Sequence, residues 1–506
     1  MFTDFAAQLV GVLSDPHLIL LSVLGVLLGI VFGCLPGISS TMALAILLPV
    51  TYALTPQGAM VFLMSVFAAT VYGGSISAIM INIPGTPGAI VTQLDGYPMA
   101  RKGKAGEAMF YSLYASTIGG FIGLAVLMLV APLVAQAAMQ FRSPEFAMAT
   151  VLGLTMLAYS TPGSTFRGIL SGCIGLLCGM VGFDALTDVP RFTFGSGSLL
   201  NGVELVPVTI GLFGLAEVMR NIDGASAIER ISTNLGKLWP SRAAIRSVTP
   251  SILRGSAIGI TVGAIPAAGS AIAVAVSYAQ EQRLSKRSKE FGTGVPEGVT
   301  GPEAANNACI GGALIPMMTL GIPGDTMTAV LMGALLIHGL RPGPLLFAEH
   351  SEFVAAVYVS LFIGTFLTFV FGMVLMRQFV RLLQAPSYIL LVIITLLCIV
   401  GSFAIRNNMT DVYVMIAFGV IGYVMAALAI PVAPLAFGLI LGPLLEENLR
   451  RSLVVSDGSW MIFIERPLAL IMLLLSVAAL AYPMIAPILR RKLAGRTGEQ
   501  PKQSAS

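Results

Sequence analysis

Charged residues are the scarcest class in this chain. Only 10% of its 506 residues are Asp, Glu, Lys or Arg, whereas 56% are hydrophobic, and the mean hydropathy is +0.90. A water-soluble core with a charged surface cannot be built from this composition. The sequence therefore excludes a soluble globular fold and predicts a polytopic membrane protein.

Metal-ligating and catalytic residue patterns are equally sparse. The three histidines lie near segment ends and the five cysteines are dispersed through apolar segments, so neither a zinc site nor a disulfide framework is indicated. The sequence holds no Walker loop of the form G-x-x-x-x-G-K-[ST], which argues against ATP hydrolysis. An intramembrane enzyme would need a nucleophile or paired acids, and Asp325 has no clear acidic mate, so we do not expect an enzyme.

Long apolar runs are abundant instead. Stretches of roughly 20 residues, each able to cross a hydrocarbon core of about 30 Å, follow one another from Leu18 to Leu489. The start of the chain has neither a basic region nor a small-residue cleavage site, so we expect the first run to be retained. The net charge of +4 resides in short loops between these runs and does not indicate nucleic-acid binding. The fold class predicted is all-α.

A Gly/Pro-broken motif occurs twice, about half a chain apart. The first copy reads GCLPGISST, YGG and NIPGTP, and the second reads GAIPAAGSA, IGG and GIPGDT, in the same order. Their positions are 33–41, 72–74 and 82–87 for the first copy, and 263–271, 310–312 and 321–326 for the second. The later spans repeat weakly, as PVTIGL and PLAFGL. Duplicated, interrupted membrane segments are typical of transporters with inverted repeats.

Lysine and arginine predict the orientation of the spans. Five basic clusters belong on the cytoplasmic side by the positive-inside rule, at 101–104, 220–246, 283–289, 377–381 and 490–502. The first apolar hairpin, 18–54, has no positive charge at its ends, whereas its counterpart, 250–279, lies between basic loops. The copies are therefore predicted to be inverted, each being a re-entrant hairpin or a close pair of helices, with the N-terminus periplasmic and the C-terminus cytoplasmic.

These assignments divide the chain into five parts. They are a first membrane repeat, 1–219, with its hairpin and a broken helix over 58–94; a cytoplasmic linker, 220–247; a second, inverted repeat, 248–446, with its hairpin and a broken helix over 304–340; an outside loop and one extra C-terminal helix, 447–489; and a cytoplasmic tail, 490–506.

The repeated breaks carry the predicted chemistry. Interrupted backbone at membrane depth is tolerated only where its N–H and C=O groups face protein or a polar cavity. We expect one side chain at each break to cap the helix that follows it. The candidates are one residue of Ser39–Thr41, then Thr86, then Ser270, and finally either Asp325 or Thr326. Four helix N-termini would then converge and present unpaired N–H groups, which suit an anion such as a carboxylate. We expect the ligand to be a small organic acid.

Four polar residues are candidates for binding a coupling ion. Asp325 either caps its helix or helps to bind a cation or proton, and the sequence leaves both open. Glu303, Asn306 and Asn307 enter an apolar segment together, which favours a functional role over a simple helix start. Asp95, beside a basic cluster, is expected in a solvated loop.

The motifs together resemble one known family. GCLPGISSTMALAILLPVTY, AATVYGGSISAIMINIPGTPGA, DGYPMARKGKAGEA, PEAANNACIGGALIPMMTLGIPGD and HGLRPGP are similar to the large membrane subunit of the tripartite tricarboxylate transporters, over essentially the whole chain. The resemblance implies a bacterial inner-membrane importer of di- or tricarboxylates or related acids, driven by a Na⁺ or H⁺ gradient and needing no other cofactor. It also implies two partners, a small membrane subunit and a periplasmic solute-binding protein. A homodimer is left open.

The family's signature loops carry over by position to the substrate-binding residues that we predict. They are Pro36, Gly37, Ser39, Ser40, Thr41, Asn82, Pro84, Gly85, Thr86, Pro266, Ala267, Gly269, Ser270, Gly321, Pro323, Gly324, Asp325 and Thr326. The second hairpin tip reads PAAGS where the first reads PGISS, so its loop geometry is less well defined by the resemblance. An elevator-like movement is expected, with rocking as the alternative. A standalone cation-coupled carrier and, less favoured, an anion channel are the rival functions.

Overall fold

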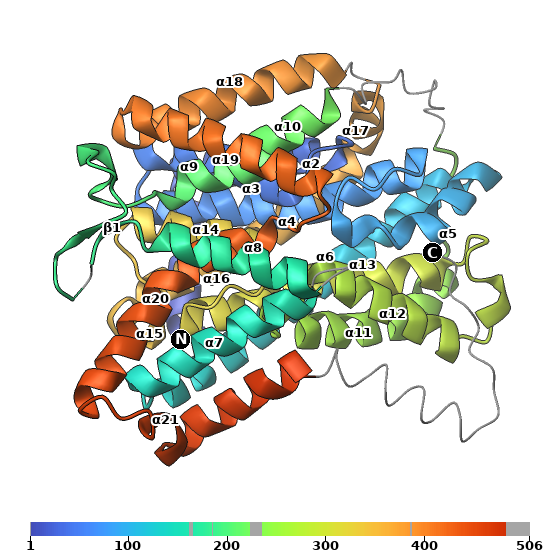
Figure 1. Cartoon of the computed structure of the whole chain (residues 1–506). Coiled ribbons are helices and arrows are strands. Elements are labelled where there is room, and N and C mark those ends of the chain that lie inside the picture. The colour runs from blue at the N-terminus through green and yellow to red at the C-terminus, as the bar shows by residue number, and fades with distance from the viewer. Residues whose placement is uncertain (1, 161–164, 185, 223–234, 385–386, 482–506) are drawn as a thin grey trace, which may run out of the picture.

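The computed structural model describes residues 2–160, 165–184, 186–222, 235–384 and 387–481, and most of these are helical (Figure 1). Among the described helices, five are long and apolar enough to cross a membrane: Pro16–Cys34, Pro56–Ile81, Thr92–Ala138, Ser351–Val374 and Met409–Ala427. The two strands in the described part, β1 (Gly182–Phe183) and β2 (Pro190–Arg191), form one short antiparallel pair. The chain is an all-α polytopic membrane protein, as its composition predicts.

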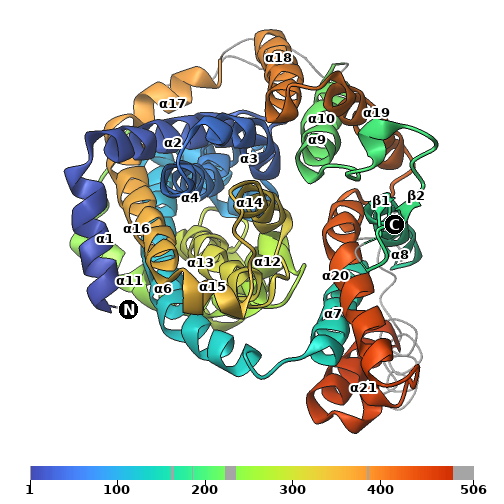
Figure 2. The same cartoon turned by 90° about the vertical axis from the view of Figure 1, so that its left-hand side faces the viewer.

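The helices form two bodies, which Figure 2 shows side by side. We call the first the loop-bearing body. It contains α1 (Phe2–Ser14), α2 (Pro16–Cys34), α3 (Ser40–Leu47), η1 (Leu48–Ala53), α4 (Pro56–Ile81), η2 (Pro87–Ala89), α5 (Thr92–Met99), η3 (Ala100–Lys104), α6 (Ala105–Ala138), α11 (Arg242–Gly263), α12 (Gly269–Leu284), η6 (Ser288–Glu290), α13 (Pro296–Leu320), α14 (Thr326–Ile337), α15 (Pro344–Glu349), α16 (Ser351–Val374) and α17 (Met376–Leu382).

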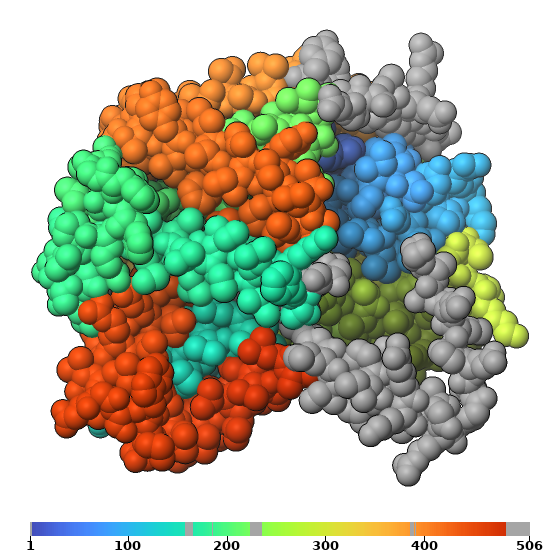
Figure 3. All heavy atoms as spheres, viewed as in Figure 1, coloured from blue at the N-terminus to red at the C-terminus, as the bar shows by residue number. Residues whose placement is uncertain are grey.

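We call the second the flanking body, and in Figure 3 it covers much of the visible face of the loop-bearing body. Besides the strands it contains α7 (Ser143–Ser160), α8 (Thr165–Gly179), η4 (Gly197–Leu199), α9 (Leu205–Thr209), η5 (Ile210–Leu215), α10 (Ala216–Asn221), α18 (Ser387–Arg406), α19 (Met409–Ala427), α20 (Ala433–Val455), α21 (Ile462–Glu465) and a last helix described over Pro467–Ala481.

Helices α4 and α13 form the centre of the loop-bearing body. Nearly every residue of both is buried, although α13 carries a glutamate and two asparagines in its middle. Helix α4 packs against α2 and α16, whereas α13 packs against α6, α11 and α12. Because this packing shields their broken C-terminal ends from lipid, the interrupted backbone there can face protein groups.

The predicted hairpins and broken segments can be located on the described helices. Helices α2 and α3 with η1 occupy the first hairpin, 18–54, and α11 and α12 occupy the second, 250–279. The first broken helix comprises α4, η2 and α5, and the second comprises α13 and α14. The inversion of the two copies, the five-part division and the orientation stay predictions. Residues 223–234 of the linker and the chain beyond Ala481 lie outside the described residues.

Small residues let α6 and α13 approach each other closely. A Cβ atom added at Gly311 would lie 2.2 Å from the backbone oxygen of Gly123 and 2.4 Å from its carbonyl carbon. Backbone cannot rotate away as a side chain can, so the two helices would have to separate. Glycine is therefore required at Gly311 by the contact between the helices.

Gly311→Ala is expected to destabilise the protein by about 1–3 kcal/mol, the usual cost of overpacking a filled interior. The measurement is the thermal unfolding temperature of the purified protein in detergent. Gly11→Ala is the matched control, because a Cβ atom at Gly11 in helix α1 would meet no atom within 4 Å. Equal unfolding temperatures for the two variants would contradict the close packing.

The structure corrects the prediction that Asp95 lies in a solvated loop. Its side chain is fully buried and accepts hydrogen bonds from the backbone N–H groups of Gly292, Gly294 and Val295, at 2.7–3.1 Å. The Tyr278 hydroxyl donates a further bond at 2.9 Å. Asp95 therefore anchors the loop that leads into α13, although this loop lies about 200 positions later in the sequence.

Candidate functional site

The first break joins α2 to α3. Gly37 has a positive φ of 84°, and the chain then enters α3 with Ser39 as the N-cap residue. The Ser39 hydroxyl accepts a hydrogen bond from the Met42 N–H at 3.1 Å. This confirms that one of the three hydroxyl residues of GISST caps the helix.

The second break follows α4, which ends at Asn82 in the left-handed region with φ 57°. Gly85 then passes so close to α2 that an added Cβ atom would lie 2.1 Å from the Gly33 carbonyl oxygen. The prediction for Thr86 is wrong in part, because only the three-residue turn η2 follows it and its hydroxyl makes no capping bond. A single turn lacks the aligned peptide dipoles of a helix.

The third break is the tip of the α11–α12 hairpin. Ala267 and Gly269 both have positive φ, 65° and 67°, which turns the chain sharply. Ser270 was expected to cap the following helix, and this is wrong, because α12 begins at Gly269 after Ala268 and has no side-chain cap. Ser270 lies in the first turn of α12 instead.

The fourth break separates α13 from α14. Gly321 has a φ of 68° at the end of α13, and Asp325 caps α14. The Asp325 carboxylate accepts a hydrogen bond from the Thr328 N–H at 2.8 Å, and the Thr328 hydroxyl oxygen accepts one from the Asp325 N–H at 2.8 Å. The two bonds form a complete capping box. The predicted capping role of Asp325 is confirmed.

All four breaks meet at one cavity of about 180 Å³. The hydroxyl oxygens of Thr41 and Thr326, from the first and fourth breaks, lie 2.7 Å apart at its edge. The lining residues are Ser40, Thr41, Val71, Thr86, Pro87, Gly88, Ala267, Gly269, Ser270, Ala271, Asn306, Asp325, Thr326, Met327, Ala433, Pro434 and Phe437. Segments up to 285 positions apart in sequence therefore build a single pocket.

Among the described residues that line the pocket there is no lysine, arginine or histidine, and Asp325 is the one ionisable residue. Three helices, α3, α12 and α14, begin at its wall, not the four that the sequence predicts. Both amide atoms of Asn306 are buried and without a hydrogen-bond partner, and so is the Thr86 hydroxyl. Unpaired buried polar atoms in a cavity wall are costly unless a ligand or water satisfies them.

Eight of the eighteen predicted substrate-binding residues line this pocket. They are Ser40, Thr41, Thr86, Ala267, Gly269, Ser270, Asp325 and Thr326. The other ten shape the loops behind it and do not line it: Pro36, Gly37, Ser39, Asn82, Pro84, Gly85, Pro266, Gly321, Pro323 and Gly324. Of the further coupling-ion candidates, Asn306 lines the pocket, whereas Glu303 and Asn307 do not.

The sequence analysis missed one wall of the pocket. Ala433, Pro434 and Phe437 come from the start of α20, in the flanking body. The weak repeat PLAFGL contains two of them and is the only sequence signal that points there. Val71, Pro87, Gly88, Ala271 and Met327 complete the set of lining residues that are not among the predicted site residues.

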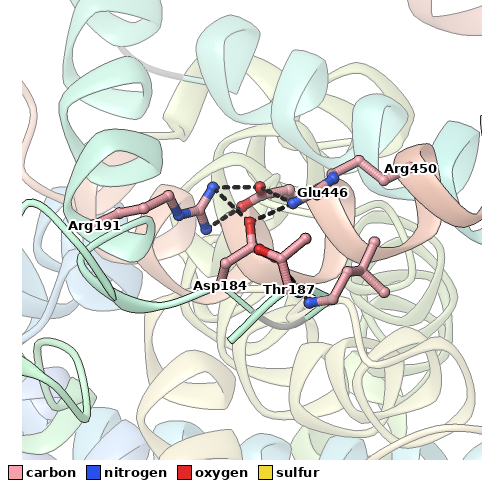
Figure 4. A network of polar contacts seen from close by, with 6 residues as sticks. Asp184, Thr187, Arg191, Glu446 and Arg450 are labelled. Atoms are coloured by element: carbon pink, nitrogen blue, oxygen red, sulfur yellow. Dashed lines mark hydrogen bonds and ion pairs between the residues drawn. The ribbon is translucent and has the colours of Figure 1, made fainter. Parts of the chain in front are cut away.

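A separate ionic network joins the loop after α8 to α20 (Figure 4). Arg191 binds Glu446 through two bonds of 2.6 and 3.0 Å, and Arg450 binds both Asp184 and Glu446. The backbone N–H group of Leu186, then the Arg450 guanidinium and the Thr187 N–H group, hold the pKa of Asp184 below its usual value. The loop between α8 and α9 is thereby tied to the helix that forms the missed wall.

Comparisons with known proteins agree with this architecture. Residues 19–437 match the Tripartite tricarboxylate transporter TctA family. One relative, "Uncharacterized 52.8 kDa protein in TAR-I ttuC' 3'region" of Agrobacterium vitis, is 37% identical over 468 residues, which is 92% of this chain and 93% of the relative. Another from Agrobacterium vitis, "Uncharacterized protein in TAR-II ttuC' 3'region", is 36% identical over 234 residues, 46% of this chain and 96% of that protein.

No solved structure matches the chain. The family match covers both copies of the broken motif and reaches the start of α20, so it includes every segment that lines the pocket. The chain belongs to the tripartite tricarboxylate transporter TctA family.

Proposed function

We propose that this chain is the large membrane subunit of an importer that carries small organic anions, di- or tricarboxylates or related acids, driven by a Na⁺ or H⁺ gradient. The observation that carries the proposal is the pocket at which four backbone breaks meet. Its hydroxyls, its unpaired Asn306 amide and the N-termini of three helices offer hydrogen bonds to an anion without a basic side chain.

The charge of the pocket supports ion coupling. An incoming carboxylate would meet the Asp325 side chain, and the lining residues supply no positive charge to offset either group. Two unpaired negative charges in a site with low dielectric constant are strongly unfavourable. A cation or proton that binds with the substrate removes this cost, so binding of the two would be mutually favourable.

The position of the pocket supports an elevator-like movement. Most of its wall belongs to the loop-bearing body, whereas Ala433, Pro434 and Phe437 belong to α20 of the flanking body. A shift of one body against the other would uncover the pocket without rebuilding its loops. Rocking of the two bodies is the alternative motion.

We further propose that the protein resides in the bacterial inner membrane, with its N-terminus periplasmic and its C-terminus cytoplasmic. It would work with a small membrane subunit and with a periplasmic solute-binding protein that delivers the acid. The family to which the chain belongs supports these partners, because it is a family of tripartite systems. No enzymatic activity is proposed.

The test is uptake of [¹⁴C]citrate, [¹⁴C]succinate and [¹⁴C]benzoate into proteoliposomes under imposed Na⁺ or pH gradients. The chain is reconstituted with its small subunit, with and without the binding protein. We expect accumulation only when both the binding protein and a gradient are present. Accumulation without the binding protein would favour a standalone carrier, and equilibration that needs no gradient would indicate a channel.

A further inference from the structure

Seven acidic side chains are almost fully buried in the described part of the protein, and their partners differ. Four of them are paired with arginine: Glu145 with Arg466, Asp184 with Arg450, Glu281 with Arg254, and Asp411 with Arg406. Asp95 is held largely by backbone N–H groups, and Asp325 caps α14. Arginine and backbone N–H groups can only donate, so they favour the ionised carboxylate.

Glu303 is the exception among the seven. Its side chain is fully buried, and its partners are four hydroxyl groups. Ser75 lies 2.6 Å from Oε1, which also contacts Thr92, while Ser112 and Ser116 lie 3.1 and 3.0 Å from Oε2. In the described residues no arginine, lysine or histidine pairs with it.

Hydroxyl groups suit both protonation states of a carboxyl group. Four hydroxyls that donate can satisfy the lone pairs of an ionised Glu303, and any one of them can turn to accept the proton of a neutral Glu303. Each of the four hydroxyl oxygens lies at hydrogen-bonding distance from a carboxylate oxygen of Glu303, so the carboxyl group can gain a proton without a change of partners. This environment differs from that of the six other buried acids.

The cluster lies directly behind the pocket. Asn306, which lines the pocket, is three residues after Glu303 on α13, about 4.5 Å along the helix axis. The amide of Asn307 donates to the Glu303 carbonyl oxygen at 3.2 Å. An ionised Glu303 would repel an anion in the pocket through a medium that screens poorly, whereas a neutral Glu303 would not.

The other titratable or charged side chains near this part of α13 come from five elements. Those on the elements that pack against α13 include Tyr72 on α4, Asp95 on α5, Glu107 and Tyr111 on α6, Arg254 on α11, and Tyr278 and Glu281 on α12. Arg254 and Glu281 neutralise each other, and Asp95 is held by backbone groups. Tyr72 has a buried hydroxyl without a partner. None of these groups is a hydrogen-bond partner of the Glu303 carboxylate.

We propose that Glu303 is a proton-binding site and that its proton travels with the anion. The carboxylate takes up one proton from the solution on the side where the anion loads, and returns it on the side where the anion leaves. This inference rests on the proposed function and deepens it, since it assigns H⁺ as a coupling ion and places one proton site outside the substrate pocket, in addition to the ion that neutralises Asp325 inside it. The four hydroxyl groups come from α4, α5 and α6, so their hydrogen bonds connect Glu303 to the helices around the breaks.

The first test needs no substrate. The full-length protein is reconstituted in lipid, and infrared difference spectra are recorded between alkaline and acidic buffers. We expect a carbonyl band of a buried protonated carboxyl group that appears on acidification in the wild type and is lost in Glu303→Gln. Glutamine has the shape of a neutral glutamic acid and can use the same hydroxyls, so the variant should fold. A band that persists in Glu303→Gln would overturn the proposal.

The second test uses the acid among citrate, succinate and benzoate that the wild type accumulates. Glu303→Gln is expected to lose accumulation driven by a pH gradient, and its exchange of external for internal acid should no longer vary with pH. Glu303→Asp should restore part of the pH dependence. Unchanged pH-driven accumulation in Glu303→Gln, or wild-type accumulation that responds to Na⁺ alone, would overturn the proposal. Absence of uptake under every gradient would overturn the proposed function instead, and the infrared band would still decide whether Glu303 binds a proton.

Discussion

Asn306→Ala is expected to reduce carboxylate uptake by about 10- to 100-fold, because a hydrogen bond to a charged group contributes about 1.5–3 kcal/mol. The Asn306 amide is the one pocket side chain with both a donor and an acceptor left unpaired. In the bound state the amide N–H group would donate to the anion, and alanine cannot replace that bond.

The same substitution is expected to leave the protein at least as stable as the wild type. An unpaired buried polar group costs about 1–3 kcal/mol, and Asn306 is only 1% exposed with both amide atoms unpaired. Alanine removes these atoms and leaves a slightly larger cavity in their place. Loss of binding with retained stability is the signature of a residue kept for its ligand.

Asn307→Ala is the matched control for Asn306→Ala. Asn307 is the next residue on the same helix, but its amide donates to the Glu303 carbonyl and it does not line the pocket. We expect a much smaller change in uptake, measured as the initial rate in proteoliposomes at equal protein content. Similar uptake by both variants and the wild type would mean that the pocket does not bind the anion.

Local chemistry explains which parts of the site the sequence could predict. The breaks at NIPGTP and GIPGDT combine residues that interrupt helices with residues that cap them, and these effects act within a few positions. Ser39 and Asp325 therefore cap their helices as predicted. Ser270 does not, because the left-handed turn at Ala267 and Gly269 starts α12 one residue before it.

Long-range contacts explain what the sequence could not predict. The neighbours of Asp95 in sequence place it in the adjacent basic loop, yet its backbone partners lie about 200 positions later. The four hydroxyls around Glu303 come from three helices, and no spacing in the sequence links them. Phe437 reaches the pocket from the flanking body, and only the packing of the two bodies places it there.

Asp325→Asn is expected to abolish gradient-driven accumulation while the protein unfolds at the wild-type temperature. Asparagine caps helices about as well as aspartate, so its side-chain oxygen can accept the Thr328 N–H bond that Asp325 accepts now. Only the negative charge is lost. Because Asp325 is the one ionisable residue among the described residues that line the pocket, its removal eliminates the charge that a cation or proton in the pocket would neutralise.

Thr328→Ala separates the capping role of Asp325 from the role of its negative charge in the pocket. Thr328 completes the capping box, so its loss should destabilise the protein by about 0.5–2 kcal/mol, while the carboxylate and therefore accumulation are kept. The measurements are the thermal unfolding temperature and the accumulation ratio of the acid in proteoliposomes. If Asp325→Asn accumulates the acid as the wild type does, Asp325 is a helix cap only. The charge in the pocket would then play no part in coupling, and Glu303 would be the remaining acid close enough to the anion to serve.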